Sequence, residues 1–167
     1  MKKIVVLMAL LCVVSGAAFA QGSASFAKDG VLIEPGSLNA NAGLAFGYGY
    51  GFGAGGGAEF PIGKFVIAEK LPFVYGAAAR LGVYLGSSVH FAVGAMGTLH
   101  FCWGALGVPD SISWFNNIDS YIGLGLQVLP SLGFNSIFGT SYFLSKNLAI
   151  NLEQGLTSTY LGVLYKF

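Results

Sequence analysis

Few side chains in this sequence could do chemistry, and one pair of them has catalytic spacing. Ser88 and His90 lie two residues apart, so on an extended strand both would point to the same face, where an imidazole can take a proton from a hydroxyl nucleophile. Such pairs are common by chance, and no carboxylate that could orient the imidazole is identifiable. We therefore expect no enzymatic activity.

The other candidate ligands do not form a metal site. His90 and His100 fall on one face of the same predicted strand, but ten residues of strand span roughly 30 Å, too far for both to bind one metal. Cys102 is interpreted as a small residue of the strand wall and not as a reactive thiol. The sequence thus predicts no metal and no cofactor.

The composition limits the class of protein. Charged residues make up 9% of the 167 residues, against roughly 25% in soluble domains. Hydrophobic residues make up 54%, and there are 26 glycines. This excludes a disordered chain and argues against a cytosolic enzyme. A net charge of +1 without a Lys/Arg cluster argues against a nucleic-acid partner. A membrane protein or a glycine-rich aggregating β protein remains.

Apolar residues recur with a period of two. From Leu38 to Phe52, apolar residues at even positions alternate with mostly small or polar ones at odd positions, which is typical of a strand with two different faces. The same alternation along the chain predicts eight strands, at 38–48, 51–62, 71–84, 88–103, 118–128, 134–144, 147–154 and 157–167. The turn between the first two strands has no clear position in the sequence. The 104–117 connection either is a surface loop or contains a short helix around 113–116.

A membrane-spanning helix is the competing interpretation. The segment between Arg80 and Asp110 has no charged residue and is long enough to cross a bilayer as a helix. However, it contains six glycines, each of which costs about 1 kcal/mol in a helix. In hydrocarbon only helices and closed barrels satisfy the backbone, and only strands have a period of two. We therefore predict an all-β, antiparallel, transmembrane up-and-down barrel of eight strands.

The first twenty residues have the pattern of a secretory signal peptide. Lys2 and Lys3 precede an apolar run, and Ala18-Phe19-Ala20 is a small-x-small cleavage site. Cleavage there leaves the barrel domain, residues 21–167. A lipoprotein signal ending at Cys12 is the alternative, but it leaves the Ala18–Ala20 site unexplained.

Strand parity places several ionisable residues inside the barrel. They are Glu59, Arg80, His90, His100, Asp119, Glu153 and Lys166. Because a lone charge there would be costly, we expect a buried charge network of Glu59, Arg80, Asp119 and Glu153. This network either holds a filled interior together or forms a polar constriction for small solutes. The many inward glycines likewise either leave a lumen or make room for large residues opposite.

Aromatic residues are expected on the outer face. The predicted set, Tyr48, Tyr50, Tyr75, Trp103, Tyr142 and Tyr165, fits a girdle at the bilayer interfaces. The alternative is that these residues are general hydrophobic filling of the outer face.

The end of the chain carries a resemblance to a known group of proteins. In Tyr160–Phe167, apolar or aromatic residues occupy every second position, namely Leu161, Val163, Tyr165 and Phe167. This resembles the C-terminal strand of bacterial outer-membrane proteins, and the whole chain is similar to eight-stranded barrels of the OmpA-transmembrane and opacity-protein type. The resemblance implies an outer-membrane location, contact with lipid, recognition of the last strand by the barrel-assembly machinery, and a monomer.

The resemblance implies no specific activity. The expected function is a structural role in envelope integrity, with an interior largely filled by side chains. The alternative is a narrow passive channel for small or partly hydrophobic solutes, and a surface-interaction role is disfavoured by short loops. A periplasmic C-terminus would make 104–117 periplasmic too, although long loops usually face outward, so the side of that connection stays open.

Overall fold

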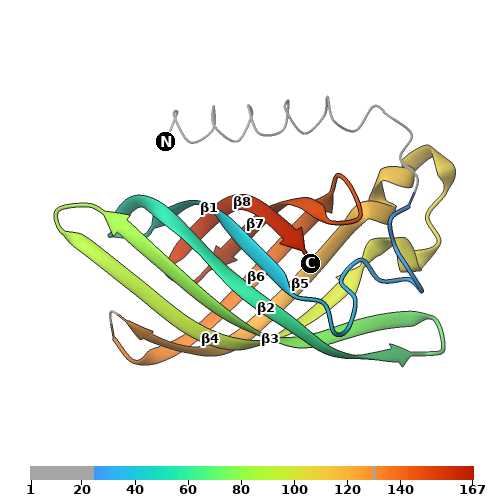
Figure 1. The fold of residues 1–167 in the computed structure, drawn as a ribbon, viewed down its shortest axis with the longest axis horizontal. Coiled ribbons are helices and arrows are strands. Elements are labelled where there is room, and N and C mark those ends of the chain that lie inside the picture. Colours follow the sequence, from blue (N-terminus) through green and yellow to red (C-terminus); the bar gives the residue numbers. More distant parts are fainter. Residues whose placement is uncertain (1–24, 130) are drawn as a thin grey trace.

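Eight antiparallel strands close into a barrel, which confirms the predicted fold class. The computed structural model describes residues 25–129 and 131–167. The strands are β1 (Asn39–Gly47), β2 (Gly51–Ile67), β3 (Leu71–Leu85), β4 (Val89–Cys102), β5 (Ile118–Leu129), β6 (Gly133–Phe143), β7 (Leu148–Gly155) and β8 (Ser158–Lys166). Each strand pairs with the next, and β1 pairs with β8 to complete the ring (Figure 1).

The observed strand ends lie close to the predicted ones, except in β2. Its predicted end was 62, but it continues to Ile67 after a register shift between Pro61 and Gly63. Proline lacks the N–H that a sheet ladder needs, so a bulge is one of the few places where a strand accepts it. The turn that the sequence left open, between β1 and β2, lies at residues 48–50.

The two ends of the barrel differ. Because the strand number is even, the start of β1 and the end of β8 lie at the same end as the β2–β3 turn, the β4–β5 connection and the β6–β7 turn (Figure 1). The β4–β5 connection contains two 3₁₀ helices, η1 (Trp103–Leu106) and η2 (Asp110–Asn117). Of the two predicted alternatives, a surface loop or a short helix, the structure shows the helix. Among the described residues no helix is long and apolar enough to cross a membrane.

The outer face of the strands is apolar. Large side chains exposed there include Leu44, Phe52, Leu81, Phe91, Leu124, Phe134, Phe138 and Val163. No charged side chain of the eight described strands belongs to this face. Lys64 on β2 pairs with Val74 on β3, and the side chain of Val74 is buried inside the barrel. Residues that pair directly across two strands point to the same face, so Lys64 does not belong to the outer face.

The prediction of an outer aromatic girdle is wrong for one residue, Tyr50. Tyr48, Tyr75, Trp103 and Tyr165 are exposed, whereas Tyr50 is half-buried and its ring lies 4.8 Å from that of His90. Tyr50 belongs to the β1–β2 turn, where strand alternation no longer decides which way a side chain points.

Inward glycines accommodate inward aromatic rings. A Cβ at Gly139 would overlap the ring of Tyr121, and one at Gly162 would overlap the hydroxyl of Tyr160. Tyr121 is 2% exposed. The sequence left two roles open for the inward glycines, a lumen or room for large side chains. At Gly139 and Gly162 the structure shows the second role.

Candidate functional site

A histidine held between two carboxylates lies inside the barrel. His100 on β4 has Nε2 2.7 Å from Glu59 Oε1 on β2 and Nδ1 2.7 Å from Asp119 Oδ2 on β5. All three side chains are almost completely buried. A neutral imidazole has only one N–H, so the two short contacts require a second proton, either on the ring or on a carboxyl group.

Arg80 continues this arrangement towards the other end of the barrel. Its Nε donates to Glu153 Oε2 at 3.0 Å, and its Nη2 lies 3.8 Å from Glu59 Oε2. Tyr121 donates to the same Glu153 oxygen at 2.8 Å. The side chain of Arg80 is 13% exposed and that of Glu153 is 9% exposed, so the pair is poorly screened by water.

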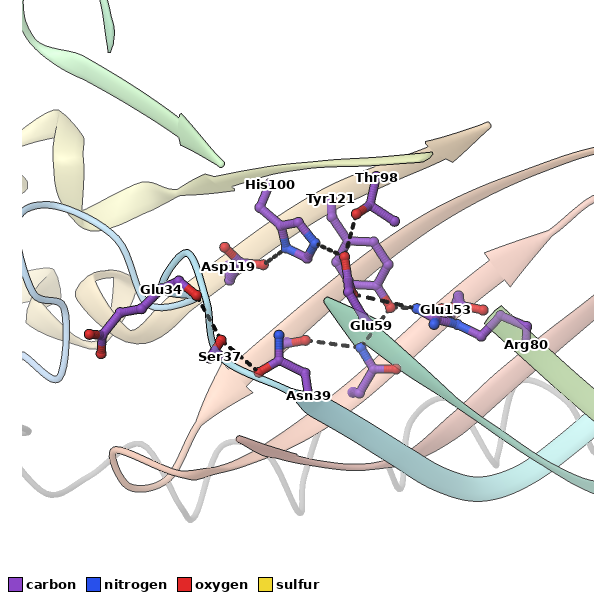
Figure 2. A network of polar contacts seen from close by, with 12 residues as sticks. Glu34, Ser37, Asn39, Glu59, Arg80, Thr98, His100, Asp119, Tyr121 and Glu153 are labelled. Carbon is purple, nitrogen blue, oxygen red and sulfur yellow. Dashed lines mark hydrogen bonds and ion pairs between the residues drawn. The ribbon is translucent and has the colours of Figure 1, made fainter. Parts of the chain in front are cut away.

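Neutral groups satisfy much of the remaining hydrogen bonding. Thr98 donates to Glu59, and Asn151 donates to the hydroxyls of Tyr121 and Ser141, both at 2.9 Å. We call the whole set the buried network (Figure 2): Glu59, Arg80, Thr98, His100, Asp119, Tyr121, Ser141, Asn151 and Glu153.

The structure therefore brings together all four residues of the expected charge network, with His100 between two of them. Glu59 contacts Arg80 and His100, whereas Asp119 meets only His100 among the charged groups. Lys166 does not join them, because its Nζ donates to the Leu32 carbonyl and to Glu34 instead.

A segment before β1 closes the end of the barrel at which β1 starts and β8 ends. In this N-terminal plug (residues 26–34), Val31, Leu32 and Ile33 are each at most 5% exposed. They form one apolar cluster with inward residues of five strands, namely Val74, Cys102, Phe143, Ala149 and Leu164. The plug thus fills the end of the lumen.

Polar contacts fix the plug in place. Lys166 Nζ on β8 donates to the Leu32 carbonyl at 3.0 Å and to Glu34 Oε1 at 3.1 Å. The hydrogen bond from Lys166 lowers the pKa of Glu34 from its ordinary 4.5. The Phe26 backbone N–H donates to Asn117 Oδ1 at 3.0 Å, which ties the plug to η2.

Sequence reasoning placed Lys166 inside the barrel but missed the plug. The available signal was the apolar triplet Val31–Ile33, which stands between the charged residues Asp29 and Glu34. Alternation carries no information about such a segment, because it is not a strand.

A cavity lies at the opposite end of the lumen. This vestibule has a volume of about 60 Å³. Its lining includes the buried apolar residues Ala45 and Ile137. Polar groups with little exposure also line it, namely those of Asn41, Arg80, Glu153 and Tyr160. Half-exposed polar residues towards the turns complete it, namely Gln127, Asn135, Thr157 and Ser158.

Two buried polar atoms of the vestibule have no hydrogen-bond partner. They are Asn41 Oδ1 and the Tyr160 hydroxyl, and both residues are 8% exposed. A buried polar group without a partner costs about 1–3 kcal/mol, so these two atoms mark a place that a polar molecule would stabilise.

The Ser88–His90 pair forms at the β3–β4 turn. Ser88 Oγ lies 2.8 Å from His90 Nε2, and the pair is exposed. Among the described residues no carboxylate hydrogen-bonds to His90, and no group of three or more His, Cys, Asp or Glu side chains could hold a metal ion. Cys102 is buried within the apolar cluster that contacts the plug.

The fold and its interior define a closed eight-stranded barrel with an apolar exterior, one plugged end and a buried charge network. No protein-family model matches the chain, and no curated protein sequence matches it. Among solved structures the chain is similar to one described as "De novo design of transmembrane beta-barrels". The two share 17% sequence identity, the match covers 81% of this chain and 98% of that chain, and the TM-score is 0.48.

Proposed function

We propose that the protein is an integral barrel of the bacterial outer membrane with a structural role in envelope integrity. The uncharged, apolar outer face of the strands supports the membrane location, because hydrocarbon accepts a closed barrel whose backbone bonds are all satisfied internally. Outer-membrane lipid is then the partner of this face. The proposal includes a single copy of the chain and no catalytic activity.

One observation carries the structural role: the lumen is obstructed twice in series. The N-terminal plug fills one end with apolar side chains, and the buried network crosses the middle with ion pairs between β2, β3, β4, β5 and β7. Eight strands enclose an interior that side chains can fill. A barrel filled in this way is a scaffold and not a conduit.

Conductance in a planar bilayer tests this role. We expect the refolded wild-type barrel to insert without current steps. Arg80→Ala removes the cation of the buried network, so it should lower the stability of the barrel. The variant should still produce no current steps in the bilayer. Reproducible current steps from the wild type, with a size or selectivity that Arg80→Ala alters, would contradict the structural role.

The alternative is a narrow passive channel for small or partly hydrophobic solutes. The vestibule favours it, since it shows that part of the lumen is not filled by side chains. For the channel to conduct, both the plug and the buried network would have to move. Current steps from the wild-type barrel that become more frequent when the plug residues are deleted would support this alternative.

Export and assembly form the second part of the proposal. Residues 1–20, which lie outside the described residues, are proposed to be a cleaved signal peptide. Leu161, Val163, Tyr165 and Phe167 are proposed to be read by the barrel-assembly machinery. The last three are exposed on the outer face, which leaves them available for recognition.

Cell fractionation and N-terminal sequencing test this part. We expect the protein in the outer-membrane fraction with Gln21 as its first residue, and we expect Phe167→Ala to reduce the assembled amount. Leu132→Ala is a matched control, because Leu132 is also exposed but lies between β5 and β6. An inner-membrane location, or an uncleaved first segment, would contradict the proposal.

A further inference from the structure

The vestibule has the lining of a binding site. Asn41 Oδ1 is a buried acceptor without a partner, and the Tyr160 hydroxyl is a buried group that can donate or accept. Arg80 also lines the cavity, and its guanidinium has five N–H groups. Its described contacts are with Glu153, Glu59 and the Ala79 carbonyl. N–H groups therefore remain for a molecule in the cavity.

The charges of the lining favour an uncharged occupant. The positive charge of Arg80 is already compensated by Glu153 at 3.0 Å. A charged solute would lose its hydration on entering, and the lining offers no uncompensated charge in return. An uncharged molecule loses less hydration free energy on entering. If it has both donors and acceptors, it can also hydrogen-bond to the two unpartnered atoms, Asn41 Oδ1 and the Tyr160 hydroxyl.

The volume sets the size of the occupant. A buried water needs about 10–15 Å³ of such space, so a cavity of about 60 Å³ holds a molecule of about four to six non-hydrogen atoms. We propose that the vestibule is a binding site for a small uncharged solute that both donates and accepts hydrogen bonds, of the size of urea or glycerol. This property does not depend on the membrane in which the barrel resides.

A titration followed by amide NMR tests the proposal. The wild-type barrel, refolded in detergent, is titrated with glycerol and separately with urea at concentrations below those that unfold it. Gly55, Gly82 and Gly94 line the cavity, so their backbone amides serve as reporters. We expect saturable shifts at these amides. We expect no saturation with acetate, which matches urea in size but carries a charge, or with the smaller cation methylammonium.

Two variants connect the binding to the orphan atoms. Tyr160→Phe removes only a hydroxyl without a partner, so the barrel should fold normally, and the spectrum itself verifies this. Loss of one neutral hydrogen bond should weaken binding about 2- to 13-fold. Asn41→Leu, which removes the orphan acceptor, should weaken it to a similar degree. Tyr165→Phe is the matched control, because Tyr165 lies on the same strand but is exposed on the outer face.

Three outcomes would overturn the proposal. Shifts that rise linearly without saturation would mean that the vestibule holds only water. Tighter binding of acetate or methylammonium would mean that the site selects charge. Equal affinity in the wild type and Tyr160→Phe, together with equal affinity in a folded Asn41→Leu, would mean that the solute binds elsewhere.

Discussion

Removing the guanidinium of Arg80 should destabilise the barrel strongly. Arg80→Ala leaves Glu153, at 3.0 Å in the wild type, and Glu59, at 3.8 Å, without their shared cation. The side chains of these two acids are only 9% and 3% exposed, so water from the vestibule replaces the lost partner only in part. Breaking a buried ion pair from one side costs about 3–5 kcal/mol, a large part of the roughly 5–15 kcal/mol that holds a folded domain together.

Equilibrium unfolding in urea, with the barrel in lipid vesicles, measures this loss. The fluorescence of Trp103 and Trp114 reports on the fold, since both belong to the β4–β5 connection. Lys28→Ala is the matched control, because it breaks an ion pair with Glu34 whose side chains are 70% and 37% exposed. Such exposed pairs contribute less than about 1 kcal/mol.

A double variant separates charge from packing. In Arg80→Ala/Glu153→Gln one of the two stranded carboxylates becomes neutral, so part of the lost stability should return. Two results would contradict this role of the buried network. One is an unfolding free energy of Arg80→Ala within about 1 kcal/mol of the wild-type value. The other is a double variant that is no more stable than Arg80→Ala.

Three further predictions follow from the interior and the plug. Gly139→Ala should cost about 1–3 kcal/mol in urea unfolding, because its Cβ would overlap the ring of Tyr121, its partner on the neighbouring strand, whereas Gly133→Ala, with nothing within 4 Å, should change stability by less than about 0.5 kcal/mol. Leu32→Ala should cost about 2–5 kcal/mol, because Leu32 is 1% exposed, and an unchanged midpoint would mean that the plug is not docked. The lowered pKa of Glu34 means that its ionised form stabilises the plug, so protease protection of the plug should be complete above about pH 4.5 and decline as the pH falls through the lower pKa of the folded state. Glu34→Gln should remove this pH dependence, since it can no longer lose a proton and pair with Lys166.

The strands could be predicted because a single physical contrast repeats along them. Each strand has an apolar outer face and an inner face of small or polar residues, so alternation located all eight. It failed at Pro61–Gly63, where the bulge shifts the register by one residue, and at Tyr50, which belongs to a turn.

The partners inside the barrel could not be predicted in the same way. Parity indicates that Glu59, His100 and Asp119 point inward, but not that they lie at one level. The stagger between neighbouring strands decides that, and it depends on the register of every pair around the ring. In the structure Asp119 pairs with Cys102 on β4, two residues beyond His100, and this offset lets the carboxylate meet the imidazole.

The anchoring of the plug has a consequence for the order of folding. Its polar contacts inside the barrel come from Lys166 on β8, and part of its apolar seat is Leu164 on the same strand. The seat is therefore incomplete until β8 has paired with both β1 and β7. The N-terminal plug, although it precedes every strand in the chain, can reach its final position only after the ring has closed.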